Sequence, residues 1–367
     1  MKNEYPIRIL HVVQRMESAG LQSFIMNIYR NIDKNKIQFD FLVHYEESQF
    51  YDKEIEELGG KIYKLSFRED KNIVKYIKDL KNFFRNHAGE YSIIHGHMDS
   101  LGFIYLYYAK KYNIKIRIAH AHTYLKDNSP KKILRRIVSK LFKKNATILL
   151  ACSERAGRSI FGDAPFIIIK NPIDYRRFKY DEKKRKELRN KMKLSNDTIF
   201  GNVGRLTRVK NQKFVIDIFN HYLNNNPNSK LFLIGSGELK NKLKKYVDDL
   251  GISSHVLFIK PTERIENYYQ VMDLFVFPSL YEGLGIACIE AQACGLPTFT
   301  SDTVPKAAKI SDIFFQISLK KDAKQWSDII IEKNNNITRR DKSLYIKKYG
   351  YDIDSITRQL MKIYEVE

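Results

Sequence analysis

Short apolar runs rich in β-branched residues recur along the chain, and segments with helical spacing separate them. Ile7–Val13 and Phe39–Val43 are typical of buried parallel strands, and Leu21–Tyr29 between them carries apolar residues at helical intervals. The same alternation continues, with further strands predicted at Ser92–His95, Lys115–Ala119, Thr147–Ala151 and Phe166–Lys170. Such alternation indicates a parallel α/β sheet that helices cover on both faces.

A second α/β series follows a break in the pattern near residues 171–195. The turn sequence Asn171-Pro172-Ile173-Asp174 leads into a highly charged stretch, which marks a domain boundary. Strands are then predicted at Ile199–Val203, Lys230–Ile234, Val256–Phe258, Leu274–Phe277 and Pro297–Thr300. We therefore expect an N-terminal domain of residues 1–172 and a C-terminal domain of residues 173–351. We expect the last helix, about 352–367, to pack back on the first domain.

The stretch 273–297 carries the densest set of candidate ligand-binding groups. After the predicted strand, a loop with Gly283 and Gly285 leads into a short helix, and Glu282 and Glu290 bracket these glycines. A glycine-containing helix N-terminus suits an anion, and nearby carboxylates suit the hydroxyls of a sugar or ribose. Taken alone, the stretch fits an ordinary strand–loop–helix unit equally well.

Two further loops have the same position, each following a strand of the second series. The first, Gly204 to Lys210, contains Arg205, and an arginine fork with a lysine charge suits a diphosphate. The second contains Gly235 and Gly237. Because ligands of parallel sheets bind at the carboxyl ends of strands, three such loops in order indicate one binding site.

These three loops together resemble family 4 of the retaining glycosyltransferases (GT4). The resemblance rests on Gly204-Arg205-Leu206, on Gly235-x-Gly237, and on the spacing of Glu282 and Glu290 after Pro278-Ser279-Leu280-Tyr281. It covers nearly the whole chain. It implies the GT-B fold, in which two Rossmann-like domains face each other across a cleft.

The resemblance also implies a role for each matching residue. Arg205 and Lys210 would clamp the donor diphosphate, and Glu290 would hold the ribose hydroxyls. Glu282, with the backbone of Gly283, Leu284 and Gly285, would hold the transferred sugar. Further donor contacts are expected from Gly20, Gly204 and Gly237. No metal or other cofactor is expected, because Arg205, Lys210 and a helix dipole can neutralise the leaving group.

Histidines supply the acceptor-side candidates of the first domain. His122, followed by Thr123-Tyr124, matches the family histidine that contacts sugar and acceptor, and His97 and His120 are further candidates. A single histidine at a strand end is more often structural. The loop at residues 18–22 matches the family's Gly-Gly-x-Glu pattern only at Gly20, since Ala19 and Gln22 depart from it.

Charge and cysteine content bear on partners and location. The 64 Lys and Arg against 42 Asp and Glu give a net charge of +22, which favours acidic partners, although no nucleic-acid-binding motif is present. Residues 131–144 form a basic amphipathic pattern that suits an anionic membrane surface or, alternatively, packing on the domain core. Three isolated cysteines, no signal-peptide core and no long apolar run predict a cytoplasmic protein, peripheral on the inner face of the membrane.

The resemblance therefore implies a retaining hexosyltransferase, which we expect to act in surface polysaccharide synthesis. It would move a sugar from a nucleotide-diphosphate donor, a UDP-sugar, to a glycan or polyprenyl-linked acceptor, with His122, Glu282, Arg205 and Lys210 as its catalytic residues. The alternatives are a nucleotide-sugar epimerase or phosphorylase of the same fold, and a catalytically weak relative that only binds sugar nucleotides.

Overall fold

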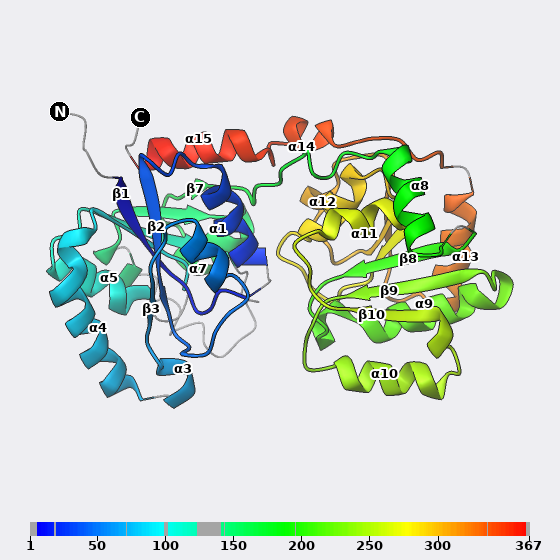
Figure 1. Cartoon of the computed structure of the whole chain (residues 1–367), viewed down its shortest axis with the longest axis horizontal. Coiled ribbons are helices and arrows are strands. Elements are labelled where there is room, and N and C mark those ends of the chain that lie inside the picture. Colours follow the sequence, from blue (N-terminus) through cyan, green and yellow to red (C-terminus); the bar gives the residue numbers. More distant parts are fainter. Residues whose placement is uncertain are drawn as a thin grey trace. The chain divides into compact units, whose positions relative to one another are not determined.

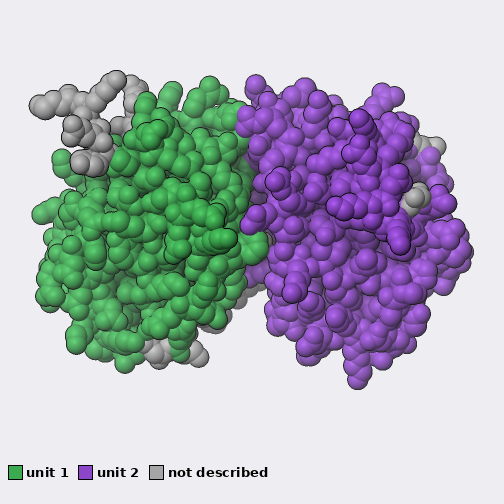
Figure 2. All heavy atoms as spheres, in the orientation of Figure 1, with its two compact units in different colours: residues 1–172, 353–367 green, residues 173–352 purple. Residues whose placement is uncertain are grey.

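The computed structural model describes residues 6–17, 20–70, 72–98, 102–122, 141–142, 144–194, 196–335 and 337–364. The chain divides into two compact units, which Figure 2 colours separately. Unit 1 consists of residues 1–172 and 353–367, and unit 2 consists of residues 173–352. The chain thus leaves unit 1 once and returns to it for its last helix.

Unit 1 is built on a parallel sheet with the strand order β3-β2-β1-β4-β5-β6-β7. Every strand pair in it has parallel register. The strands are β1 (Ile7–Val12), β2 (Ile37–Val43), β3 (Ile62–Lys64), β4 (Ile93–Gly96), β5 (Ile116–Ala121), β6 (Ile148–Ala151) and β7 (Ile167–Ile168). The order reverses between β1 and β4, the position at which α/β sheets bind ligands.

Helices cover both faces of this sheet, because alternate strand residues feed two apolar cores. Ile9 of β1 packs with residues of the helices α1 (Gly20–Asn31) and α15 (Ile353–Ile363), whereas its neighbour Leu10 packs in the core on the opposite face. Figure 1 shows the helices α1 and α15 of this unit. The helices on that opposite face are α4 (Ile73–His87), α5 (Gly102–Lys111) and α7 (Glu154–Phe161). The shorter α2 (Asp52–Glu57) and α3 (Phe67–Asp70) lie between α1 and α4 in sequence.

Unit 2 repeats the plan with the strand order β10-β9-β8-β11-β12-β13, again with parallel pairs throughout. Its strands are β8 (Thr198–Val203), β9 (Ser229–Ile234), β10 (Val256–Ile259), β11 (Leu274–Phe277), β12 (Thr298–Ser301) and β13 (Phe314–Ile317). Here β8 and β11 are the central neighbours, so the loops that follow them share one edge of the sheet.

The helices of unit 2 also fall on two faces. One core receives residues from α11 (Ile265–Val271), α12 (Ile286–Ala293) and α14 (Leu344–Lys348). The other receives residues from α9 (Gln212–Asn225), α10 (Lys240–Asp249) and α13 (Ala323–Asn334). A further helix, α8 (Glu182–Lys191), occupies part of the charged stretch for which the sequence predicted no helix.

The two parallel sheets confirm the predicted fold class, but several strand limits were wrong. Strand β5 runs to Ala121, so His120 lies inside it and not beyond its end. Strand β7 covers only two residues, Ile167–Ile168, of the predicted five. Both errors come from reading a polar residue as a strand end or an apolar run as fully paired.

The basic amphipathic segment 131–144 lies outside the described residues except for Leu141, Phe142 and Lys144. Phe142 is buried in the unit 1 core, where its ring lies 5.9 Å from that of Phe161. This apolar residue is therefore packed on protein. Among the described helices, none has the length and apolar character needed to cross a membrane.

Candidate functional site

Three loops meet at the carboxyl edge of the unit 2 sheet, following β8, β9 and β11. These strands are neighbours in the order β9-β8-β11, so their carboxyl ends place the loops side by side. The loops contain the candidate donor-binding residues Gly204, Arg205, Lys210, Gly237, Glu282, Gly283, Leu284 and Gly285. The structure thus brings together the groups that the sequence placed at separate strand ends.

An ion pair joins the loops after β8 and β11. Lys210 Nζ lies 2.6 Å from Glu282 Oε1, and it also lies 4.8 Å from the centre of the Phe277 ring. The lysine side chain is 22% exposed and the glutamate side chain 9% exposed. Because the glutamate is nearly buried, removal of the lysine would leave a poorly solvated carboxylate without this ion pair.

One side-chain and one backbone hydrogen bond also join the two loops. Asn211 Nδ2 donates to the Pro278 carbonyl over 3.0 Å, and the Leu280 N–H donates to the Val209 carbonyl over 2.8 Å. These bonds flank the ion pair. The position of Lys210 relative to the β11 loop is therefore fixed before any ligand is present.

The glycines after β9 allow that loop to pack directly on the loop after β8. A Cβ at Gly235 would lie 2.0 Å from the Gly204 oxygen, and one at Gly237 would lie 2.4 Å from the Leu206 oxygen. In addition, the Leu206 N–H donates to the Ser236 carbonyl over 2.8 Å. The close packing of the two loops thus explains why both positions need glycine, whether or not a ligand contacts them.

Glu290 lies in α12, which begins after Gly285 in a left-handed conformation with φ +85°. Its Oε2 accepts a hydrogen bond of 2.9 Å from the Tyr269 hydroxyl. Although part of the side chain reaches the surface, the removal of water around the carboxyl raises its pKa to about 7, against smaller opposing effects of Tyr269 and Arg177. The carboxyl can therefore change its charge near neutral pH.

The charged groups of the site surround the buried thiol of Cys288. Burial raises the pKa of this thiol, the charges of Glu282 and Glu290 raise it further, and that of Lys210 opposes them. All three charges are thus close enough to act on one atom.

Arg205 is exposed, and its guanidinium makes no hydrogen bond to a described residue, which leaves it available to an anion.

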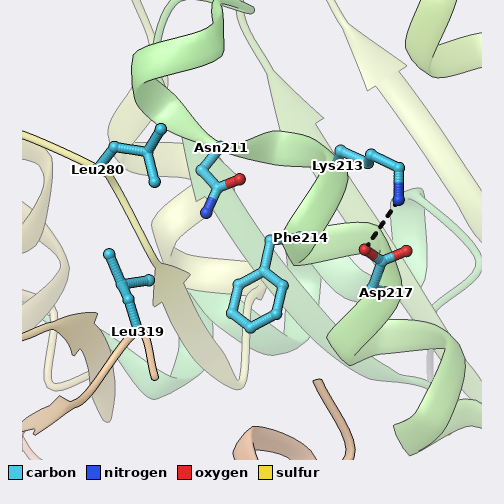
Figure 3. A pocket seen from close by; sticks show the side chains of 6 residues that line it. All are labelled: Asn211, Lys213, Phe214, Asp217, Leu280 and Leu319. Atoms are coloured by element: carbon cyan, nitrogen blue, oxygen red, sulfur yellow. Dashed lines mark hydrogen bonds and ion pairs between the residues drawn. The ribbon is translucent and has the colours of Figure 1, made fainter. Parts of the chain in front are cut away.

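A hollow of about 210 Å³ adjoins these loops (Figure 3). Six residues line it: Asn211, Lys213, Phe214, Asp217, Leu280 and Leu319. Lys213 Nζ lies 3.2 Å from Asp217 Oδ2, and Asn211 is held by the β11 loop. Since these polar groups already have partners, we assign the candidate site to the loop residues and not to the hollow.

Unit 1 brings together five buried or nearly buried histidines at the ends of β1, β4 and β5. They are His11, His95, His97, His120 and His122. The sequence suggested three of them but missed His11 and His95, because a histidine within an apolar strand run looks like an isolated core residue. Burial lowers the pKa of His11 and of His122 to about 3, and it lowers the pKa of the other three well below the ordinary value. All five imidazoles are therefore neutral at pH 7.

The remaining candidate, Gly20, is the first residue of α1, and a Cβ there would meet no atom within 4 Å. Ser18 and Ala19 lie outside the described residues. Gln22 is buried, and its Nε2 donates to the Arg15 carbonyl over 2.7 Å. Where the family pattern has a glutamate, this chain therefore has an amide that holds the loop before α1.

Two family models match the chain, one in each half. Residues 18–177 match the model described as Glycosyltransferase Family 4, and residues 183–343 match the one described as Glycosyl transferases group 1. The second match contains the three loops of the candidate site. Together the two matches span most of both units.

Curated relatives resemble the chain over much of its length. A Bacillus subtilis protein that carries the name glycosyltransferase EpsF is 31% identical over 98% of this chain and 96% of its own. An Escherichia coli enzyme, UDP-Gal:alpha-D-GlcNAc-diphosphoundecaprenol alpha-1,3-galactosyltransferase, is 24% identical over 81% of this chain and 79% of its own. The capsular polysaccharide biosynthesis glycosyltransferase CapH of Staphylococcus aureus is 22% identical over 98% of both.

The fold has a solved counterpart in Anabaena Alr3699/HepE, crystallised in complex with UDP and glucose. The two chains align with a TM-score of 0.80 over 98% of this chain and 99% of the other, at 16% identity. This likeness confirms the GT-B architecture of two Rossmann-like parallel-sheet domains. With the match to EpsF over nearly its whole length, it shows that this chain is a glycosyltransferase and belongs to glycosyltransferase family 4.

Proposed function

We propose that this glycosyltransferase moves a sugar from a UDP-sugar to a glycan or polyprenyl-linked acceptor in polysaccharide synthesis, with retention of anomeric configuration. The observation that carries the proposal is the Lys210–Glu282 ion pair, which joins two sheet-edge loops beside the exposed Arg205. The Escherichia coli relative is named for a UDP-Gal donor and a diphosphoundecaprenol acceptor, and CapH is named for capsular polysaccharide. The solved structure of the same fold holds UDP and glucose.

In this proposal, cationic groups of unit 2 stabilise the leaving diphosphate. Lys210 and Arg205 contact its oxygens, and the N-terminus of α12 adds its positive dipole. As the bond between the anomeric carbon and the β-phosphate oxygen breaks, the acceptor oxygen attacks from the same face. The departing diphosphate takes the proton of the acceptor hydroxyl, so the products are UDP and the glycoside. No metal ion is required for the neutralisation of charge.

The carboxylates of unit 2 hold hydroxyl groups in this scheme. Glu282 is kept in place by Lys210 and accepts hydrogen bonds from the transferred sugar, and Glu290 accepts them from the ribose. In unit 1, the neutral imidazole of His122 would contact the acceptor, and His97 and His120 are further acceptor-side candidates. These residues act by positioning and by electrostatics.

A screen of UDP-, GDP- and other sugar nucleotides tests the proposal. We expect thermal stabilisation by UDP-sugars, together with UDP release that depends on an acceptor and yields a glycoside. Isomerised donor without a glycoside would instead identify an epimerase. Nucleotide binding without turnover across the panel would identify a relative that only binds.

We also propose that residues 131–144 contact the anionic inner face of the membrane, to which a lipid-linked acceptor would be anchored. Basic residues near such a surface each contribute about 1 kcal/mol of attraction. Sedimentation with phosphatidylglycerol vesicles should then fall steeply with salt, and binding to neutral vesicles should be weak. Equal binding to both vesicle types would contradict this contact.

A further inference from the structure

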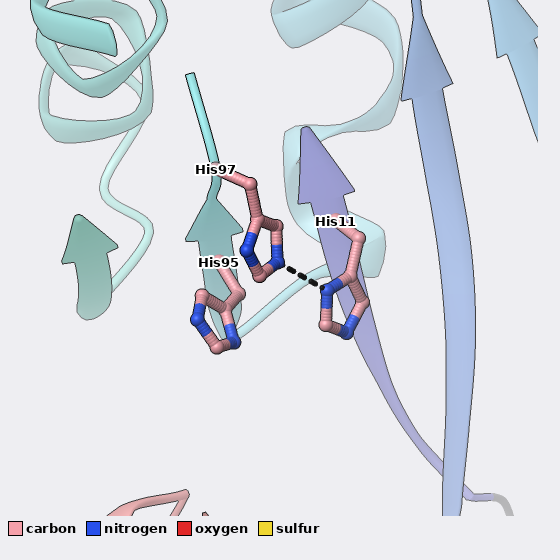
Figure 4. Close-up of side chains that lie close together, drawn as sticks. All are labelled: His11, His95 and His97. Atoms are coloured by element: carbon pink, nitrogen blue, oxygen red, sulfur yellow. Dashed lines mark hydrogen bonds between the residues drawn. The ribbon is translucent and has the colours of Figure 1, made fainter. Parts of the chain in front are cut away.

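The histidines of unit 1 form two hydrogen-bonded chains, and the first runs from β1 through β4 to the end of β5. His11 Nδ1 lies 3.0 Å from His97 Nε2, the contact drawn in Figure 4, and His97 Nδ1 lies 2.9 Å from His122 Nε2. A neutral imidazole has one N–H and one lone pair, so the chain can run in either direction. At its two ends, His11 Nε2 and His122 Nδ1 have no partner among the described residues.

The second chain starts at the C-terminal end of the described residues. The Tyr364 hydroxyl lies 2.7 Å from His95 Nδ1, and His95 Nε2 lies 3.1 Å from His120 Nδ1. The last nitrogen of this chain, His120 Nε2, is buried and has no partner among the described residues. A buried polar atom without a partner costs about 1–3 kcal/mol, so three such atoms in one cluster favour a bound water or ion there.

Three of the histidines have the spacing of a metal-ligand set. One ring nitrogen from each of His97, His120 and His122 lies within 4.8 Å of those from the other two. The rings of His120 and His122 are only 4.0 Å apart between centroids. Tetrahedral ligands with metal–nitrogen bonds of about 2.0–2.1 Å lie about 3.3 Å apart, so small side-chain rotations suffice for coordination.

The hydrogen-bond chains also allow the tautomers that ligation needs. If His97 binds through Nδ1, its Nε2–H donates to His11. If His120 binds through Nε2, its Nδ1–H donates to His95, which in turn donates to the Tyr364 oxygen. A hydrogen bond from the second ring nitrogen is typical of metal-binding histidines, because it fixes the ring and its tautomer. Coordination would give His120 Nε2 a partner, while His11 Nε2 and the second nitrogen of His122 would have none among the described residues.

We propose that His97, His120 and His122 bind one divalent transition-metal ion of the Zn²⁺ class, with a fourth coordination position left to solvent. Three imidazoles suit such an ion better than Mg²⁺ or Ca²⁺, which prefer oxygen ligands. His122 is partly exposed and offers access from the surface. The inner trio His11, His95 and His97 also has close nitrogens, but it is fully buried and shares His97. The ion is separate from the diphosphate chemistry of unit 2.

Metal binding itself tests this site, independently of whether the protein transfers a sugar. Tag-free protein is stripped with a chelator and titrated with Zn²⁺ in a calorimeter and with Co²⁺ in a spectrophotometer. We expect one ion per chain and the intense visible bands of tetrahedral Co²⁺. His11→Leu removes an outer hydrogen-bond partner and should weaken metal binding by about 10- to 100-fold. His122→Ala removes a ligand and should weaken metal binding more than His11→Leu does.

The matched control is His221→Ala, a change to an exposed histidine of α9 in unit 2, which should leave binding unchanged. The wild-type Co²⁺ spectrum needs no variant, so misfolding of a variant cannot hide the answer. The proposal is overturned if the wild type shows no saturable binding, or if its Co²⁺ spectrum equals that of the ion in buffer. Equal affinity in wild type and a folded His122→Ala variant would also overturn it.

Discussion

At the scale of single residues, Glu290 is a candidate-site carboxyl whose charge changes near neutral pH. Its folded-state pKa is about 7 because its surroundings exclude water, whereas the ordinary value is 4.5. The folded chain thus holds this proton more tightly than the unfolded chain does. The protonated carboxyl therefore contributes to folding stability. This contribution is fully present below pH 4.5 and is lost as the pH rises through about 7.

Ionised Glu290 is the better acceptor for ribose hydroxyls, so we predict that affinity for UDP rises between pH 6 and pH 8. If only the ionised form binds, the change is roughly 10-fold, since a group with this pKa is about one-tenth ionised one unit below it. Calorimetric titration of UDP at several pH values measures it.

Glu290→Gln is the matched control, because it keeps the shape and removes the titration. The phosphate of UDP also titrates, and its effect on affinity is the same in this variant. The pH dependence measured for Glu290→Gln is therefore subtracted from that of the wild type. The same pH dependence in wild type and Glu290→Gln would show that Glu290 does not bind the nucleotide.

At the scale of elements, the candidate site depends on the packing of one loop on another. Gly235 after β9 meets the backbone of Gly204 after β8, where no Cβ fits. We therefore predict that Gly235→Ala lowers both thermal stability and UDP affinity. Gly251→Ala serves as the control, because Gly251 also has a positive φ of +69° but would meet no atom within 4 Å.

Gly251→Ala should lower the free energy of unfolding by about 1 kcal/mol, because of backbone strain alone. Differential scanning calorimetry compares the two variants. A Gly235→Ala loss no larger than that of Gly251→Ala would mean that the two loops move apart easily, and that their contact does not shape the site.

The elements also show what sequence patterns can and cannot predict. Strand β11 was predicted correctly to the residue, because Leu274–Phe277 is a short apolar run closed by a proline. Helix α8 was missed, because it is held by polar contacts and not by an apolar stripe. Arg185 binds the carbonyls of Gln270, Val271 and Met272, which end α11, over 2.7–2.9 Å.

The same limit applies within the candidate site. The loops and their order follow from local sequence, so Lys210 and Glu282 could both be named. Their ion pair joins residues 72 positions apart, and no local pattern predicts it. The histidine cluster was likewise seen only in part, because three separate strands bring its members together.

At the scale of the whole molecule, the chain completes unit 1 with its last helix. Leu360 and Ile356 of α15 are buried in the core that also contains Phe24 of α1. Unit 1 therefore cannot bury this face until residues beyond unit 2 have been made. This connectivity ties the stability of the histidine-bearing unit to α15.

We predict that Leu360→Ala destabilises unit 1 by about 2–5 kcal/mol, as is typical of a buried leucine. Hydrogen exchange of the β1 and β4 amides measures the effect in unit 1 directly. Arg358→Ala, a change at an exposed position of the same helix, should alter the free energy of unfolding by no more than about 0.5 kcal/mol. Equal protection in both variants would show that α15 is not needed for the unit 1 core.

The central claim is that the loops at the unit 2 sheet edge hold the donor during transfer, and Lys210→Ala tests it most directly. Acceptor-dependent UDP release is measured for this variant and for Lys213→Ala, which alters a neighbouring exposed lysine. Because Lys210→Ala leaves the Glu282 carboxylate without its partner, thermal melting checks the fold, and the double variant Lys210→Met with Glu282→Gln removes both charges. We predict a loss of about 100-fold or more in kcat for both Lys210 variants, with Lys213→Ala near wild type. Near-wild-type turnover in a folded Lys210→Ala protein would contradict the account.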